Sequence, residues 1–135
     1  MTTIERAATV GTLQPLGGGF HAFIQPDGGW GLNNAGLFAG ERSTVLIDTC
    51  FTESRGKRLR DAVAAVANQP VGVIVNTHHH GDHTYGNYLF PEATIIAQHA
   101  CRDRMLATGL DTCHLFEGVD WGDLEISEPT VTFTD

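Results

Sequence analysis

The sequence predicts a mixed α/β fold built around a parallel strand, helix, strand unit. Three observations indicate this class. Residues 44–48 and 71–76 are apolar runs of strand length, and residues 54–67 between them carry apolar side chains at helical spacing. Such an order forms a parallel pair with a right-handed crossover. The third observation is a histidine-rich loop directly after the second strand, at the edge where open α/β sheets place their chemistry.

The first 40 residues are predicted to form strands joined by glycine-rich turns. Residues 12–25 contain two apolar stretches around the triple glycine 17–19, and a second turn is expected at residues 26–29. A further strand with a glycine-softened turn is expected in residues 30–40. The triple glycine does not predict a phosphate loop, because neither a Lys-Ser/Thr pair nor a helical pattern follows it. We therefore expect a hairpin-like opening.

The strand at residues 44–48 is expected to be fully buried, and residues 54–67 to form an amphipathic crossover helix. The basic residues of this helix are expected on a wet face rather than in an anion site. They are Arg55, Lys57, Arg58 and Arg60.

Further elements are expected after the histidine loop. They are a short helical turn in residues 85–91, a buried strand at 94–97, a helix at 101–108 with Met105 and Leu106 facing inward, and the start of a strand in 128–135.

The loop of residues 77–83 predicts a metal site. In an extended segment His78 and His80 converge on one metal while His79 points the other way. Gly81 then permits a turn that returns Asp82 and His83 to the same cavity, at the position of a second metal or of a metal-bound water. These ligands suit one or two zinc ions first, then iron or manganese. A plain polar loop, as in an expression tag, is the alternative, but tags lie at termini and this run lies mid-chain.

Asp48 is a polar residue at the end of the apolar run 44–48. It could accept a hydrogen bond from the ring N–H of a metal-binding histidine and so fix its tautomer. It could equally cap the following turn. Strand-end position alone favours neither role.

The pattern formed by His78, His80, Asp82 and His83 resembles the His-x-His-x-Asp-His signature of the metallo-β-lactamase superfamily. Residues 43–49 resemble the family's apolar strand ending in Asp-Thr, and residues 34–36 the small turn before it. The resemblance covers most of residues 10–97 and implies an αββα sandwich. His83 after Asp82 resembles the glyoxalase II, lactonase and general hydrolase branches. Tyr85 stands where many members have glycine, which weakens an assignment to glyoxalase II.

The resemblance implies that residues 1–135 are the N-terminal half of such a domain. In the superfamily a second half brings a further histidine, a carboxylate that bridges the metals and a final histidine. No histidine follows His114 here. We therefore expect a missing C-terminal half, a second chain or a second copy as partner.

The predicted activity is metal-dependent hydrolysis of a small-molecule substrate. Zinc-bound hydroxide, available near neutral pH, would attack an ester, thioester, lactone or lactam bond. Asp82 is the predicted catalytic residue, because it would bind a second metal or orient the attacking water. Two alternatives stay open, a mononuclear iron oxidoreductase on the same ligands and a non-catalytic metal-binding half-domain that acts as an assembly module.

Charge and hydropathy limit the partners and the compartment. The formal charge of −8 and a pI near 5.2 argue against nucleic acid or an anionic membrane as main partner. No apolar run is long enough to span a bilayer, and residues 1–6 lack a signal-peptide core. We therefore predict a cytoplasmic protein.

The three cysteines, Cys50, Cys101 and Cys113, include no Cys-x-x-Cys pair and predict neither a disulfide framework nor a thiolate zinc site. Buried, inert thiols are expected. Cys50, just past Asp48, is the one of the three that could line the pocket.

Overall fold

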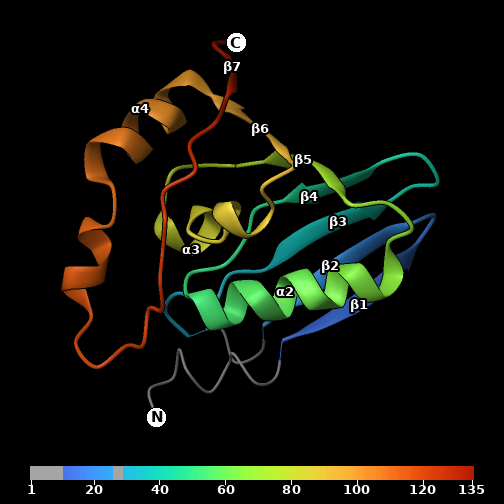
Figure 1. Ribbon diagram of the computed structural model, residues 1–135, viewed down its shortest axis with the longest axis horizontal. Coiled ribbons are helices and arrows are strands. Elements are labelled where there is room, and N and C mark those ends of the chain that lie inside the picture. The colour runs from blue at the N-terminus through green and yellow to red at the C-terminus, as the bar shows by residue number, and fades with distance from the viewer. Residues whose placement is uncertain (1–10, 26–28) are drawn as a thin grey trace.

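One sheet of seven strands runs through the part of the chain that the computed structural model describes, residues 11–25 and 29–135. The strands lie side by side in chain order (Figure 1). Neighbours pair antiparallel from β1 to β4 and parallel from β4 to β7. The strands are β1 (Thr12–Gly17), β2 (Phe20–Ile24), β3 (Ala35–Ala39), β4 (Thr44–Ile47), β5 (Val71–Val75), β6 (Thr94–Gln98) and β7 (Val131–Phe133). The mixed α/β class is therefore confirmed.

The opening hairpin is as predicted. Strands β1 and β2 pair antiparallel, and Gly17, Gly18 and Gly19 between them all have positive φ angles. Glycine adopts this backbone region without the steric cost that a side chain brings, so the triple glycine makes the turn. The second predicted turn, at residues 26–29, and the segment 1–6 lie wholly or partly outside the described residues.

Helix α2 (Glu53–Val66) connects the parallel strands β4 and β5, as the strand, helix, strand order predicted. Thr52 caps its first turn, because the Thr52 side chain accepts a hydrogen bond from the backbone N–H of Arg55. Leu59 and Val63 are buried in one core cluster with residues of the sheet. In Figure 1 the helix lies in front of β1 and β2. Burial of this apolar stripe holds the crossover against the sheet.

The prediction that the basic residues of α2 all lie on a solvent-exposed face is wrong in the first turn of the helix. The side chain of Arg55 is buried, with 1% of its surface exposed, whereas Lys57, Arg58 and Arg60 are exposed as expected. Arg55 donates hydrogen bonds to Gln25 Oε1 at 2.6 Å and to the carbonyl of Gly31. A buried charge needs such acceptors, and both come from the segment around the β2–β3 connection, which the helical pattern cannot reveal.

The second half of the described chain adds short helices around β6. They are α3 (Gly81–Thr84), the 3-10 turn η1 (Asn87–Leu89), α4 (His99–Thr108) and the 3-10 turn η2 (Asp111–Leu115). Met105 and Cys101 of α4 are buried in a cluster with Ala97 of β6. The inward orientation predicted for Leu106 is wrong, because half of its surface is exposed. No helix in residues 11–25 or 29–135 is long and apolar enough to cross a membrane.

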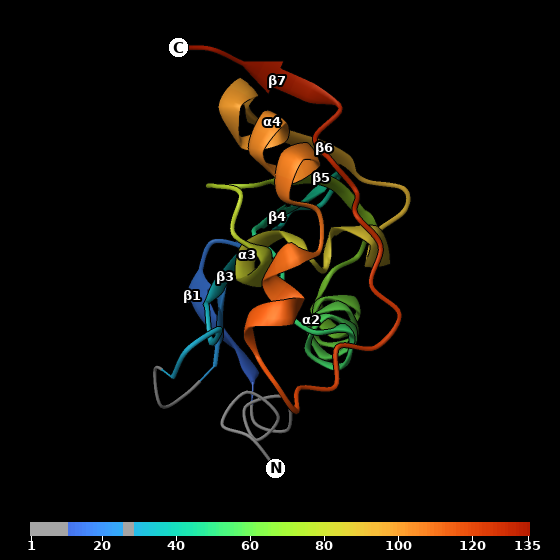
Figure 2. The same cartoon turned by 90° about the vertical axis from the view of Figure 1, so that its left-hand side faces the viewer.

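Helix α2 packs with buried residues of the sheet in one cluster and α4 packs on β6 in another, and Figure 2 shows α2 to one side of β1 and β3. The opposite face carries apolar side chains in register across strands. One row is Phe20, Phe38, Val45 and Val73, and the next contains Ile47, Val75, Ile96 and Val131. The full burial predicted for residues 44–48 is wrong, because Ile47 is 45% exposed on this face. The sheet therefore has one packed face and one apolar face that is partly open.

Candidate metal centre

The histidine loop lies where two neighbouring parallel strands end. The backbone N–H of Asp48, just after β4, donates to the carbonyl of Val75 at 3.0 Å, and that of Asn76, just after β5, donates to the carbonyl of Ile96 at 3.0 Å. Because parallel strands end at the same edge of a sheet, Asp48 and the loop that begins at Thr77 meet there. The predicted position of the site at this edge follows from the β4–β5 pairing.

Asp48 sits in a left-handed backbone conformation, with φ of 61°. Aspartate tolerates this region better than most residues. Its buried carboxylate accepts the backbone N–H of Thr77 at Oδ1, 2.8 Å away, and the hydroxyl of Thr77 at Oδ2, 2.7 Å away. The Nδ1 atom of His83 lies 2.8 Å from the same Oδ2. The carboxylate thus contacts the backbone of the histidine loop and a histidine ring, and among the described residues none of its hydrogen bonds goes to the turn that follows Asp48.

The histidine rings of the loop form one cluster. The ring centroids of His78 and His83 are 4.2 Å apart, and those of His78 and His80 are 4.7 Å apart. His79 is 6.4 Å from His78 by the same measure, although it lies 4.7 Å from His80. His78 therefore occupies the centre of the cluster, and His79 lies toward its edge.

Asp82 lies beside His83. Its Oδ2 atom is 3.4 Å from His83 Nε2, on the opposite side of the ring from Asp48. Burial alone would lower the pKa of His83, but its contacts with Asp48 and Asp82 outweigh burial and raise the pKa to about 9. Burial would likewise raise the pKa of Asp82, and the neighbouring His83 lowers it. Without a metal, a protonated His83 is held between two carboxylates.

Asp48, His78 and His83 have potential ligand atoms that all lie within 4.8 Å of one another. His80 and Asp82 fall outside this set of three but contact its members. Both oxygens of Asp48 are already in contact with neighbours, Oδ1 with the backbone N–H of Thr77 and Oδ2 with the Thr77 hydroxyl and His83 Nδ1. Because Nδ1 of His83 lies beside Asp48, the ring nitrogen that faces Asp82 is Nε2.

A buried polar network beneath the loop, which sequence reasoning missed, fixes the backbone of His83. Its carbonyl accepts the backbone N–H of Thr49 at 2.8 Å and the Thr49 hydroxyl at 3.1 Å, with Asn76 Nδ2 at 3.4 Å. Asn87 completes the network, because its side-chain amide donates to Asn76 Oδ1 at 2.8 Å and its Oδ1 accepts from Asn76 Nδ2 at 3.2 Å. The sequence carries only part of the signal, because Asn76 and Asn87 flank the histidine loop whereas Thr49 follows a different strand, and the pairing of β4 with β5 brings the three together.

Gly81 matters for a different reason from the predicted one. It begins α3 and is not among the glycines with positive φ, so no unusual turn requires it. Instead, a Cβ atom at position 81 would lie 2.5 Å from the ring of Tyr85. The phenol of Tyr85 is buried and donates to the carbonyl of Gly109 at 3.1 Å, so the ring packs beneath the loop.

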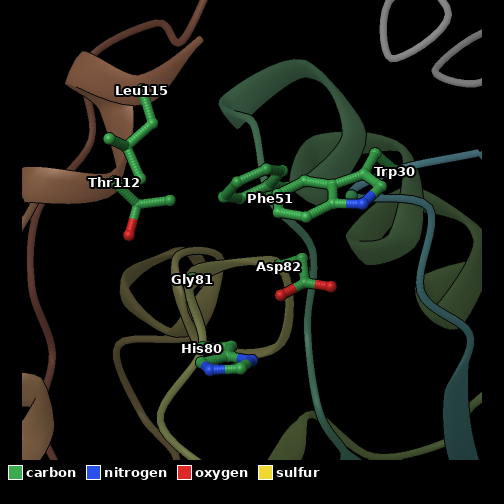
Figure 3. A pocket seen from close by; sticks show the side chains of 8 residues that line it. Trp30, Phe51, His80, Gly81, Asp82, Thr112 and Leu115 are labelled. Carbon is green, nitrogen blue, oxygen red and sulfur yellow. The ribbon is translucent and has the colours of Figure 1, made fainter.

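A pocket of about 410 Å³ opens beside the histidine loop. Figure 3 shows Trp30 and Phe51 on one side and Thr112 and Leu115 on the other, with His80 and Asp82 at its base. Trp30 was predicted to begin a strand, but β3 begins only at Ala35, and Trp30 stands in a turn with 74% of its surface exposed. The pocket therefore places an apolar wall next to the polar residues of the loop.

Cys50 does not line this pocket. It is fully buried in the main core, and burial raises the pKa of its thiol to about 12. The isolated histidines have local contacts, since His21 Nδ1 is 3.1 Å from the Gly19 carbonyl and His99 pairs with Asp103 one helical turn away.

Comparison with known proteins supplies the family. The model of the metallo-beta-lactamase superfamily matches residues 28–110, more than half of the chain. Metallo-beta-lactamase domain-containing protein 1 of Mus musculus is 36% identical over 89 residues, which cover 65% of this chain and 32% of that protein. The chain thus spans about a third of this curated relative.

Solved structures share the fold. The metallo-beta-lactamase from Pontibacter korlensis superposes with a TM-score of 0.69 at 16% identity, over 91% of this chain and 52% of that one. The metallo-beta-lactamase FIM-1 from Pseudomonas aeruginosa, in a mono-zinc form, superposes with a TM-score of 0.62 at 15% identity, over 91% of this chain and 50% of that one. The chain therefore spans about half the length of these structures.

Proposed function

The chain belongs to the metallo-beta-lactamase superfamily, and from this premise we propose that it forms one part of the active site of a metal-dependent hydrolase. The observation that carries the proposal is the clustering of His78, His80 and His83 at the carboxyl edge of the parallel strands. A hydrolytic metal site needs neutral nitrogen donors next to a cleft that admits substrate. The pocket beside His80 provides such a cleft.

The donor set fits zinc. Imidazole nitrogens with one carboxylate are ligands that zinc prefers. Burial, together with the nearby imidazoles of His83 and His80, lowers the pKa of His78, so its neutral, metal-binding form prevails at neutral pH. His78 and His80 would hold one ion, and Asp82 and His83 would hold a second or fix the attacking water. When bound, zinc supplies a Lewis acid and lowers the pKa of a coordinated water to about 7.

The chain's own residues would bind and orient the reactants. Asp82 lines the pocket, and with its pKa lowered by His83 its carboxylate is ionised at neutral pH. It can therefore accept a hydrogen bond or a proton beside the substrate. The apolar wall of Trp30, Phe51 and Leu115 would exclude water around the nonpolar part of an ester, thioester, lactone or lactam.

A matched pair of variants tests the ligand assignment. His80→Ala should lower the zinc content of the purified chain by far more than His79→Ala, because His79 lies at the edge of the cluster. Both loop variants should fold, since His80 is exposed and His79 half-buried. Equal loss of zinc from the two variants would reject the assignment.

We also propose that the partly open apolar face receives the remaining part of the site, from further sequence or from another chain. The rows through Val45 and Val75 run across neighbouring strands, and Ile47 is exposed among them. Each Å² of apolar surface left in water forfeits about 25 cal/mol, so an uncovered face of this kind favours association. The similar solved structures are about twice as long as this chain, which supports a second segment as occupant.

The isolated 135-residue chain tests this second proposal. It should self-associate or aggregate, bind zinc weakly, and hydrolyse ester substrates negligibly until a segment with the remaining ligands is added. Oligomeric state, zinc stoichiometry and esterase activity are the three measurements. A stable monomer that holds two zinc ions with full turnover would contradict it.

A further inference from the structure

Thr77 lies between the buried carboxylate of Asp48 and the ring of His78. Its hydroxyl oxygen is 2.7 Å from Asp48 Oδ2 and 3.0 Å from His78 Nδ1. Its backbone N–H donates separately to Asp48 Oδ1 at 2.8 Å. The side chain of Thr77 thus connects Asp48 with His78. Among the hydrogen bonds of the described residues, none joins these two side chains directly.

Counting protons fixes the direction of both hydrogen bonds. An ionised carboxylate only accepts, so the single hydroxyl proton of Thr77 points to Asp48. The remaining contact must then run from His78 Nδ1–H to the hydroxyl oxygen. That places the ring proton of neutral His78 on Nδ1 and leaves Nε2 free. The same count puts a proton on Nδ1 of His83, which lies 2.8 Å from Asp48 Oδ2.

We propose that Thr77 is a positioning residue through which Asp48 sets the tautomer and orientation of His78, as it does directly for His83. One buried carboxylate then presents the Nε2 atoms of two neighbouring imidazoles, whose ring centroids are 4.2 Å apart. This role rests on the proposed metal site, because a single tautomer matters most to a ring that must bind a metal through one nitrogen.

Two substitutions separate the hydroxyl from the shape of the side chain. Thr77→Val keeps the branched shape and removes the hydroxyl, whereas Thr77→Ser keeps the hydroxyl. Asp48→Asn is the third variant, since asparagine also tolerates the left-handed backbone at position 48. All three are made in the 135-residue chain, with circular dichroism to compare their folds.

The first readout needs no metal. Ring ¹⁵N chemical shifts of His78 at about pH 8, above the ordinary imidazole pKa, report which nitrogen carries the proton. The parent and Thr77→Ser should show the proton on Nδ1. Thr77→Val should show a mixture of tautomers at His78 while the ring shifts of His83 stay as in the parent. Asp48→Asn should disturb both rings.

The second readout is zinc affinity, measured with zinc ion alone in competition with a chromophoric chelator. Loss of a residue that orients a metal-binding histidine typically costs 10-fold to 100-fold in affinity, so we expect about a 10-fold loss in Thr77→Val and rescue by Thr77→Ser. An unchanged His78 tautomer in Thr77→Val would overturn the proposal, and so would equal losses of affinity in Thr77→Val and Thr77→Ser. If the tautomer responds as predicted but the parent binds no zinc, the positioning by Thr77 stands and the proposed metal site fails.

Discussion

The pKa of His83 predicts how the stability of the metal-free chain depends on pH. Burial lowers this pKa, but the contacts with Asp48 and Asp82 raise it to about 9 from an ordinary value of 6.5. Each pKa unit is worth about 1.4 kcal/mol, so the protonated ring stabilises the fold by on the order of 3 kcal/mol. Because the pKa is higher in the folded than in the unfolded chain, this stabilisation is fully present below pH 6.5. It is lost as the pH rises from 6.5 through 9.

Asp48→Asn removes the carboxylate whose hydrogen bond is the largest single interaction that raises the pKa of His83, while nearly keeping the size of the side chain. The pKa of His83 should fall in this variant. The parent loses unfolding free energy between about pH 6.5 and 9, and the variant should lose at most half as much. The assay is urea unfolding across this range with a chelator present, so that no metal interferes. Asp103→Asn is the matched control, because the His99–Asp103 pair is exposed and should contribute little.

Parent and Asp48→Asn curves that run parallel between pH 6.5 and 9 would refute the reasoning. In that case the proton on His83 would not be held by Asp48. Any constant offset between the two parallel curves would then report only weaker packing in the variant.

Three further predictions concern the same region and the core. Asp82→Asn should leave the first zinc largely in place but remove most hydrolytic activity in an assembly shown beforehand to be active; activity within a few-fold of the parent would reject the role of Asp82. Leu59→Ala should lower the unfolding free energy by about 2–5 kcal/mol, because the Leu59 side chain on α2 is fully buried against the sheet. The control is Leu106→Ala at an exposed position, which should change the unfolding free energy by less than about 0.5 kcal/mol. Gly81→Ala should lower the unfolding free energy, measured in urea, by about 1–3 kcal/mol, because the added Cβ atom would press on the Tyr85 ring. A gain in stability, as expected of alanine in an unobstructed helix, would show that the ring moves away freely.

Local patterns predicted the order of elements well. Apolar runs and helical spacing placed β4, α2, β5 and β6 within about two residues, because each of these signals depends on burial of a continuous stripe or run. Val66 and Leu106 show the limit of the same argument. Both are apolar and at or near helical spacing, yet both are exposed, because helical spacing alone does not say which side of a helix another element will cover.

Most long-range polar contacts could not be predicted from the sequence. The burial of Arg55 depends on acceptors at Gln25 and Gly31, which lie about 30 and 24 positions earlier in the chain. The clustering of His78 with its neighbours was expected from the loop pattern. The contacts of Thr77 with Asp48 and His78 were not expected, since they depend on how the ends of two strands meet in space.

The central claim is that the histidine loop binds a metal, and the most direct test is to follow individual histidine rings during a zinc titration of the 135-residue chain. Ring resonances of His78 and His80 should shift or broaden progressively as zinc is added, while those of His21 and His99, which lie in local contacts elsewhere, stay in place. Zinc that perturbs His21 or His99 first, or that leaves His78 and His80 unchanged, would contradict the account.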